Sequence, residues 1–284
     1  MSLVAGGGGD KSVSGGRAPR TLEGMHTAAT SPNRRLTAVV TGASSGIGRA
    51  TAVRLVADGW RVLAVARRQE KLDALAEETG CEVLSVDVTD DDSVARLAER
   101  SRELFGDELN AVVHVAGGAL GVDQVAEADL AKWQGMYDMN VLGALRVTRA
   151  LLPAVRASGR GDVLFVTSVA AHEAYQGGAG YNAAKAGEHM LARALRLELN
   201  GEKVRVIEIA PGMVHTEEFS LTRLGDQDAA DKVYDGVEQP LTAEDCADVI
   251  SYALNAPHHV NLDLVTVRPL AQAAAHAVAR GKGV

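Results

Sequence analysis

The stretch that decides the fold is Thr41-Gly42-Ala43-Ser44-Ser45-Gly46-Ile47-Gly48, which follows directly on the apolar run 36–40. Glycines here allow a tight turn and a close approach of backbone to a pyrophosphate. A helix that opens near Ile47 would point its free N–H groups at the negative charge. The spacing G-x-x-x-G-x-G differs from the commoner G-x-G-x-x-G. A turn that binds nothing is the alternative, but the position at a first strand-to-helix junction favours a dinucleotide site.

Beyond this turn, short apolar runs alternate with amphipathic stretches that have helical periodicity. The seven runs are 36–40, 61–66, 82–86, 111–115, 162–167, 204–209 and 262–267. Acidic or capping residues at 89–92 and 242–245 mark the starts of two helices. Strands and helices that alternate seven times predict an α/β protein. We expect a single doubly wound Rossmann domain, with a seven-stranded parallel sheet and helices on both faces.

The composition divides the chain into three segments. Residues 1–35 hold a run of four glycines and then Ser, Gly, Pro and Arg without an apolar period, which predicts a disordered leader. This leader lacks the apolar core of a secretory signal. Residues 36–270 are predicted to form the Rossmann domain, and residues 271–284 a C-terminal tail.

Charge and cysteine usage exclude several classes of function. The formal net charge of −8 argues against a nucleic-acid partner, because phosphate binding needs clustered Lys and Arg. Cys81 and Cys246 match no zinc or redox spacing, and they suit a reducing compartment. No apolar run approaches the length of a membrane span, about 18 residues. We therefore expect no membrane association and a cytoplasmic location.

The end of the second predicted strand indicates which nucleotide binds. Arg67 and Arg68 stand where an NAD enzyme usually has an acidic residue, and two guanidiniums suit a 2′-phosphate. Arg49, just past the glycine turn, could assist. The alternative is a solvated basic helix start beside Glu70, but NADP(H) is the cofactor that we predict. Asp87 and Val88 end the third strand, where the adenine would lie; Asp87 could equally cap a helix.

Four further residues are able to handle a proton beside that cofactor. Tyr181 and Lys185 lie one turn apart on a predicted helix and share one face. A phenol titrates near ~10, and a neighbouring ammonium lowers that pKa, so Tyr181 becomes a usable acid/base. Ser168 closes the fifth strand and could orient a substrate oxygen. Asn140, inside the predicted helix 129–158, could anchor a water that relays protons through Lys185.

These motifs together resemble the short-chain dehydrogenase/reductase family over about residues 36–269. The resemblance implies that Asn140, Ser168, Tyr181 and Lys185 are catalytic, and that the segment from Pro211 to Val214 closes over the nicotinamide. It also implies a homotetramer or homodimer. The expected cofactor-binding residues are Gly42, Ser44, Ser45, Gly46, Ile47, Gly48, Arg67, Arg68, Asp87, Val88, Ala116, Gly117, Tyr181, Lys185, Pro211, Gly212 and Val214.

A narrower resemblance points to a substrate class. Segments 67–72, 218–220 and 259–261 are similar to those of NADP-dependent 3-hydroxy acid dehydrogenases, which oxidise serine, L-allo-threonine and related acids. The substrate residues implied are Ser168, Tyr181 and Arg223, with Arg223 meeting the carboxylate. A solvent-facing Arg223 on a flexible lid is the alternative interpretation.

One position departs from the family pattern. His114 and Val115 stand where the family has two asparagines, before the retained Ala116 and Gly117. We expect His114 to be a buried histidine with a satisfied hydrogen bond and no catalytic role. His172, His189 and His215 have no carboxylate or cysteine partner at metal spacing in the sequence, so we predict no metal site.

The leading hypothesis is therefore an NADP(H)-dependent oxidoreductase that interconverts a hydroxyl and a carbonyl on a 3-hydroxy acid. Two alternatives stay open. A broad-specificity ketone or 3-oxoacyl reductase would use the same chemistry without the carboxylate site. A non-catalytic NADP(H)-binding regulator would keep the scaffold alone, although such proteins commonly lose the tyrosine or lysine that this chain retains.

Overall fold

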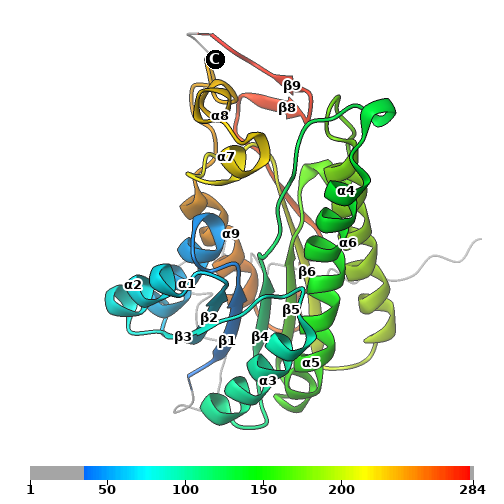
Figure 1. The fold of residues 1–284 in the computed structure, drawn as a ribbon. Coiled ribbons are helices and arrows are strands. Elements are labelled where there is room, and N and C mark those ends of the chain that lie inside the picture. The colour runs from blue at the N-terminus through cyan, green and yellow to red at the C-terminus, as the bar shows by residue number, and fades with distance from the viewer. Residues whose placement is uncertain (1–34, 282–284) are drawn as a thin grey trace, which may run out of the picture.

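The computed structural model describes residues 35–281. Its main sheet has seven parallel strands in the order β3-β2-β1-β4-β5-β6-β7 (Figure 1). The strands are β1 (Thr37–Thr41), β2 (Arg61–Ala66), β3 (Glu82–Ser85), β4 (Ala111–His114), β5 (Gly161–Val166), β6 (Val204–Pro211) and β7 (Val265–Val267). The predicted sheet is confirmed, and every predicted apolar run overlaps one strand. The predicted leader, apart from Arg35, and the last three residues lie outside the described part of the chain.

Helices cover both faces of the sheet, as Figure 1 shows. α1, α2 and α9 pack on one face, and α3, α5 and α6 on the other. The helices are α1 (Gly46–Ala57), α2 (Gln69–Thr79), α3 (Asp91–Phe105), α4 (Leu130–Tyr137), α5 (Gly143–Ala157), α6 (Ala179–Glu198), α7 (Phe219–Leu224), α8 (Gln227–Lys232) and α9 (Ala243–Asn255). Short turns of 3-10 helix occupy η2 (Val125–Glu127) and η4 (Val169–Ala171).

Two apolar cores result from the alternation of side chains along each strand. In β1, Ala38 and Val40 pack towards α1 and α9, whereas Val39 packs towards α3 and α5. All three side chains are fully buried. Strands buried on both faces explain why the sequence shows continuous apolar runs rather than alternation.

The two helix starts read from the sequence are confirmed. Asp90 caps α3 by accepting a hydrogen bond from Ser93 N at 2.6 Å. Thr242 and Asp245 form a reciprocal capping box at the start of α9. Both caps satisfy N–H groups that would otherwise lack a partner in the first helical turn.

The predicted helix 129–158 contains an interruption that the sequence did not predict. α4 is followed without a break by a turn of π-helix, η3 (Asp138–Leu142), and then by α5. Asn140 lies in this wide turn and is fully buried. Turns of this kind are frequent at functional sites.

The segments after β6 and at the C-terminus lie over the carboxyl end of the sheet (Figure 1). α7 and α8 lie there, and so does an antiparallel ribbon formed by β8 (Gln272–Ala274) and β9 (Ala277–Val278). The side chain of Gln272 is buried, and its Oε1 accepts a hydrogen bond from Met213 N at 2.7 Å. Residues from the predicted tail thus contact the segment that follows β6.

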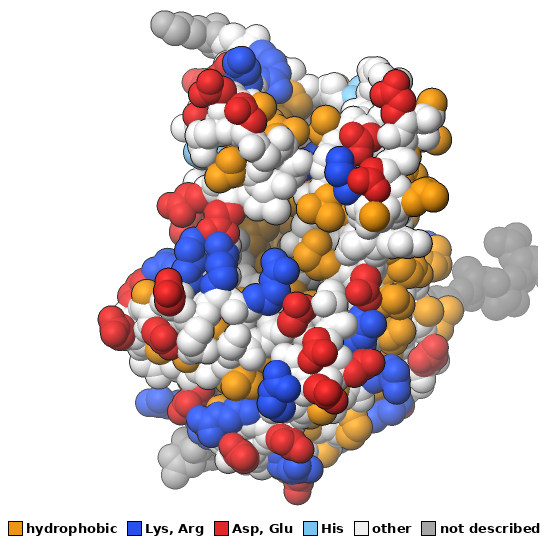
Figure 2. All heavy atoms as spheres, in the orientation of Figure 1, with side chains coloured by type: hydrophobic (Ala, Val, Ile, Leu, Met, Phe, Trp, Pro, Cys, Tyr) orange, Lys and Arg blue, Asp and Glu red, His pale blue; other side chains and the backbone are white. Residues whose placement is uncertain are grey.

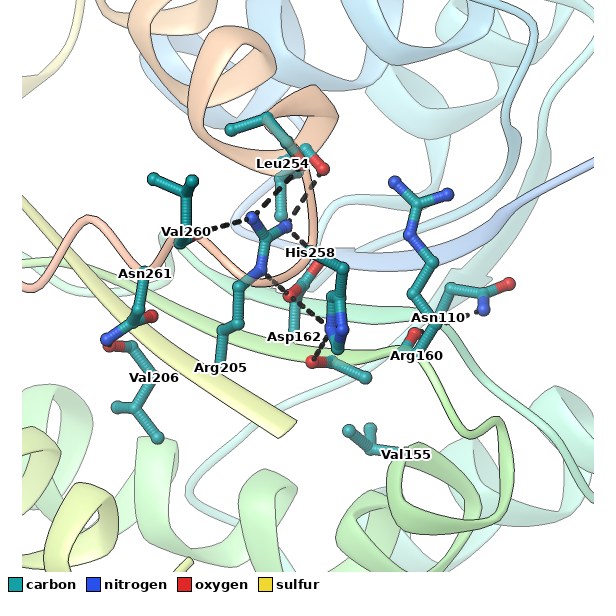
Figure 3. A network of polar contacts seen from close by, with 12 residues as sticks. Asn110, Val155, Arg160, Asp162, Arg205, Val206, Leu254, His258, Val260 and Asn261 are labelled. Atoms are coloured by element: carbon teal, nitrogen blue, oxygen red, sulfur yellow. Dashed lines mark hydrogen bonds and ion pairs between the residues drawn. The ribbon is translucent and has the colours of Figure 1, made fainter. Parts of the chain in front are cut away.

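At the opposite end of the sheet, a buried ion pair joins β5, β6 and the end of α9. Figure 3 shows Arg205 surrounded by its partners. Its guanidinium donates to both carboxylate oxygens of Asp162, at 2.6 and 2.9 Å, and to the carbonyls of Leu254, Ala256 and Val260. Both charged side chains are almost fully buried. This network fixes the amino ends of two strands against the loop after α9.

Candidate active site

A cleft of about 930 Å³ runs along the carboxyl ends of the strands, below α7. Figure 2 shows the surface hollowed there, with Lys and Arg side chains gathered beside the hollow. Every site residue predicted from the sequence lines this cleft except Asn140 and Lys185. Those two are buried directly behind its wall, since a Cβ built on Gly117 would lie 3.4 Å from Lys185 Nζ and closer still to Asn140 Oδ1.

The glycine turn has the close backbone contacts that the sequence predicts. Gly42 has a φ of +69°, and a Cβ there would lie 2.8 Å from Ala116 N. Thr41 Oγ1 accepts hydrogen bonds from the backbone N–H groups of Val115 and Ala116, both at 3.0 Å. These hydrogen bonds hold the glycine turn against the end of β4. The junction therefore forms although His114 and Val115 replace the two asparagines of the family pattern.

Arg68 is the centre of a polar cluster at the end of β2. Its guanidinium donates to the hydroxyls of Ser44, at 2.8 Å, and Ser45, at 3.0 Å, both in the glycine turn. It also binds both carboxylate oxygens of Glu218, at 2.7 and 2.6 Å. Lys71 contacts the same carboxylate. The hydrogen bond from Arg68 leads the effects that lower the pKa of Glu218 to about 2.

The other residues predicted around the nucleotide differ in their contacts. Arg67 lines the cleft, whereas Arg49 is turned to an ion pair with Glu78 on α2. Asp87 also lines the cleft, and its Oδ1 accepts hydrogen bonds from both the backbone and the hydroxyl of Thr89. Asp87 thus combines its local turn-forming role with a position in the predicted adenine region.

Tyr181 and Ser168 meet in the wall of the cleft. Ser168 caps η4 by accepting a hydrogen bond from Ala170 N at 3.1 Å, and its hydroxyl also contacts Tyr181. Tyr181 packs edge-on against Phe219 of α7, with ring centroids 5.7 Å apart. Burial raises the pKa of Tyr181, and the charge of Lys185 acts in the opposite direction. The lysine therefore has the predicted effect, but burial outweighs it in this structure.

Lys185 lies behind Tyr181, with Nζ 6.0 Å from the phenol ring centroid. Its ammonium donates to Val166 O at 3.1 Å and to Glu188 at 2.7 Å. Although burial alone would lower the pKa of Lys185, the charge of Glu188 and its other partners raise it. Burial raises the pKa of Glu188 to about 7, although the charge of Lys185 and its hydrogen bond lower it.

Glu188 is a residue that sequence reasoning missed. A signal was present, because positions three apart on a helix share a face and Glu188 follows Lys185 at that spacing. The side chain of Glu188 is fully buried.

Asn140 anchors backbone rather than facing the cleft. Its amide nitrogen donates to Gly118 O at 2.9 Å and Met136 O at 2.7 Å, and its oxygen accepts from Gly118 N at 3.1 Å. These bonds fix the loop after β4 beside Lys185. Two of the three hydrogen bonds of the Asn140 side chain therefore position this loop, and the third joins it to α4.

Arg223, from α7, lies beside Tyr181 with its guanidinium carbon 6.0 Å from the phenol ring centroid. It donates to Gly121 O at 3.2 Å, to the hydroxyl of Tyr175 at 3.0 Å and to Gly177 O at 3.1 Å. Arg223 is thus half-buried and bonded to three groups, and its contact with a substrate carboxylate stays a prediction. Tyr175 was missed by the sequence analysis.

The histidines are divided between two environments. His114 is buried as predicted, hydrogen-bonded to Thr148 at 2.9 Å, and burial lowers its pKa to about 3. The expectation that His172 and His189 lack a carboxylate partner is wrong, because both reach Glu208 of β6. Sequence spacing could not show this contact, since the three residues come from separate elements.

With this geometry in place, the chain can be assigned to a class of enzymes. Residues 36–225 match the short chain dehydrogenase family, and the chain belongs to it. It is an oxidoreductase that acts on small molecules. The predicted family resemblance is confirmed.

Three relatives place the chain within that family. An uncharacterized oxidoreductase of Mycobacterium tuberculosis is 53% identical over 243 residues, covering 85% of this chain and 94% of the relative. A serine 3-dehydrogenase of Agrobacterium fabrum is 40% identical over 239 residues, covering 83% and 94%. The closed form of a serine dehydrogenase complexed with NADP+ superposes with a TM-score of 0.81 at 31% identity, covering 87% of this chain and all of that one.

Among the helices of residues 35–281, none is both long and apolar enough to cross a bilayer.

Proposed function

We propose that the protein is an NADP(H)-dependent 3-hydroxy acid dehydrogenase. The observation that carries this proposal is that two arginines line one cleft, each beside a different part of the predicted site. Arg68 lies beside the glycine turn, and Arg223 lies beside Tyr181. One suits a nucleotide phosphate, and the other suits a substrate carboxylate that is separated from the reacting carbon by one carbon atom.

The cofactor proposal rests on the residues around Arg68. Arg68 and Lys71 converge on one anionic group, the carboxylate of Glu218, which Ser45 also contacts, and the hydroxyl of Ser44 accepts a hydrogen bond from Arg68. A 2′-phosphate offers the same chemistry with more charge and more acceptor oxygens. The same groups would hold it, and Glu218 would have to give up its place. The binding of NADP+ by the solved relative supports the same nucleotide here.

Arg68→Ala is expected to weaken NADPH binding by roughly 10–150-fold, because it removes charge-assisted hydrogen bonds worth about 1.5–3 kcal/mol. NADH, which lacks the phosphate, should lose little. Glu218→Gln should act in the opposite direction and tighten NADPH binding several-fold. Fluorescence titration of each nucleotide measures both variants, with the exposed Arg96→Ala of α3 as control. Equal losses for NADPH and NADH would contradict a phosphate site.

The substrate proposal rests on the N–H groups of Arg223 that its three hydrogen bonds leave unused. A guanidinium has five N–H donors, and three bonds of Arg223 are to Gly121, Tyr175 and Gly177. One N–H on each terminal nitrogen is left to meet an anion. A carboxylate one carbon from the reacting carbon matches the short distance between Arg223 and Tyr181. The name of the serine 3-dehydrogenase relative supports a hydroxy acid of this size.

The residues of the cleft then divide the reaction between them. Ser168 hydrogen-bonds the substrate oxygen and holds it facing Tyr181. Tyr181 accepts the hydroxyl proton during oxidation and returns it during reduction, and the charge of Lys185 favours the phenolate that this exchange requires. Asn140 keeps the loop after β4 in place beside Lys185. Bound NADP(H) supplies or accepts the hydride.

Arg223→Ala is expected to raise KM for a 3-hydroxy acid by at least about tenfold and to leave turnover of a neutral ketone within a few-fold. A lost hydrogen bond to a charged group costs roughly 1.5–3 kcal/mol, and a neutral substrate never makes it. Steady-state kinetics on the two substrate types measure the difference, with the exposed Arg193→Ala of α6 as control. A uniform loss on both substrates would show that Arg223 only maintains the position of α7.

The experiment that tests the whole proposal follows nicotinamide absorbance with NADP+ and NAD+ against serine, L-allo-threonine and 3-hydroxybutyrate. Turnover with NADP+ on these acids is the expected result. Activity on neutral ketones alone would favour the broad ketone reductase and discard the carboxylate site. No turnover on either, with NADPH still bound, would favour the regulator.

We also propose a homotetramer or homodimer. Tyr137 of α4 and Met190 and Leu197 of α6 are large apolar side chains that remain exposed in one copy of the chain. Light scattering during size-exclusion chromatography would give the mass, and a monomer would overturn this assembly. A cytoplasmic location stays a prediction that cell fractionation can test.

A further inference from the structure

Behind the catalytic residues, three side chains from separate elements converge on one point. His172 follows η4 directly, His189 belongs to α6, and Glu208 belongs to β6. Their ligand-type atoms all lie within 4.8 Å of one another. Among residues 35–281 this is the one group of three or more such side chains that converges in this way. The proposed function uses none of the three.

The distances are close to those of a metal-ligand set. His189 Nδ1 lies 2.7 Å from Glu208 Oε2, and His172 Nε2 lies 3.5 Å from Glu208 Oε1. The two imidazole rings meet edge-on, with centroids 4.3 Å apart. Ligand atoms bound tetrahedrally at zinc distances are separated by about 3.3 Å. Small side-chain movements would therefore place one ion between the three groups.

The charge balance of this region also favours a cation. The carboxylate of Glu208 is 1% exposed, and its hydrogen-bond donors are His189 and the hydroxyl of Thr167 at 2.7 Å. A second buried carboxylate, Glu188, lies nearby on α6 and is paired directly with the ammonium of Lys185, whose charge also acts on Glu208. A buried carboxylate is stable when it is paired or binds a metal. A divalent ion between the imidazoles would give Glu208 that pairing.

The surroundings meet two further requirements of a metal site. Thr167 donates to Glu208 Oε1, which leaves Oε2 for the metal and fixes the orientation of the carboxylate. The side chains of His172 and His189 are 27% and 14% exposed, so an ion can enter from solvent. Two imidazoles and one carboxylate, with water as fourth ligand, suit zinc and its neighbours better than Mg²⁺ or Ca²⁺, which prefer oxygen ligands alone.

We propose that His172, His189 and Glu208 bind one divalent transition-metal ion of the zinc class, with water completing a tetrahedral site. The site joins three segments that carry predicted active-site or cofactor-binding residues. His172 lies at the end of the turn that Ser168 caps, His189 lies one helical turn after Lys185, and β6 leads to Pro211. A bound ion therefore holds the serine turn, the lysine helix and the strand below the cleft in one arrangement. This inference is independent of the cofactor and of the substrate.

The test is a titration of the full, untagged, chelator-treated chain with Co²⁺, followed by visible absorption. We expect one equivalent to bind and to give the strong absorption bands of a tetrahedral site, which Zn²⁺ then abolishes by displacement. His172→Ala should weaken Co²⁺ binding by at least about 100-fold, since loss of outer partners alone costs 10–100-fold. His172 is partly exposed, so this variant should fold, and circular dichroism checks that it does.

Two further variants sharpen the result. Glu208→Gln keeps the volume of the side chain and its bond from Thr167 but removes the charge, and it should bind Co²⁺ as weakly as His172→Ala. His259→Ala removes an exposed histidine outside the cluster and should bind like the unaltered chain. The proposal is overturned if the unaltered chain gives only the weak spectrum of hydrated Co²⁺, or if His172→Ala binds as tightly as the His259→Ala control.

Discussion

Tyr181→Phe is expected to lower kcat by roughly 10²–10⁴-fold, the usual contribution of a positioned general acid or base. The substitution removes one oxygen and keeps the ring, so the edge-on packing against Phe219 should survive. NADPH binding should therefore stay within a few-fold of the original value. Steady-state turnover and fluorescence titration of NADPH separate the two effects.

The matched control for this variant is Tyr252→Phe, which removes the same oxygen from an exposed tyrosine of α9. Its turnover should equal that of the unaltered chain. Retention of full activity by Tyr181→Phe would remove Tyr181 from the proton transfer and with it the proposed mechanism. A parallel loss of NADPH binding would point instead to a disturbed cleft.

Asp162→Ala is expected to lower the free energy of unfolding by about 3–5 kcal/mol. The substitution leaves the guanidinium of Arg205 buried among the carbonyls of the loop after α9, with no negative charge to balance it. His258, which also lies near Asp162, would lose its carboxylate as well. Urea denaturation followed by circular dichroism measures the change.

The comparison for Asp162→Ala is an exposed pair of similar geometry. Arg156 binds both oxygens of Glu202, at 2.7 and 2.8 Å, but at the surface. Glu202→Gln should leave the urea midpoint nearly unchanged, because water and salt screen exposed pairs. If both substitutions moved the midpoint equally, burial would not be the source of the stability.

The fold could be predicted because its signals are local. Apolar runs buried on both faces, caps such as Asp90 and Thr242, and the glycine turn are each contained in a few consecutive residues. Tyr181 and Lys185 were found for the same reason, since one turn of one helix holds both.

The remaining parts of the site depend on contacts between distant segments. Glu218 reaches Arg68 across 150 positions, and Gln272 reaches Met213 from the C-terminal ribbon. The pairing of His189 with Glu208 likewise requires α6 to lie on β6. No rule on residue spacing predicts such contacts, because they depend on the order of the strands in the sheet. Sequence reasoning could name candidate residues but could not say which of them meet.

The π-helical turn at Asp138–Leu142 has a consequence for engineering the chain. Such a turn holds one residue more than a regular helix of the same span, and each helical residue rotates the chain by about 100°. Deleting one residue from 138–142 would restore a regular helix of the same span, so α4 and α5 could keep their faces towards their present neighbours. The side chains inside the turn would change direction, and Asn140 would lose its bonds to Gly118. The extra residue therefore serves to aim Asn140 and is not needed for the packing of the two helices.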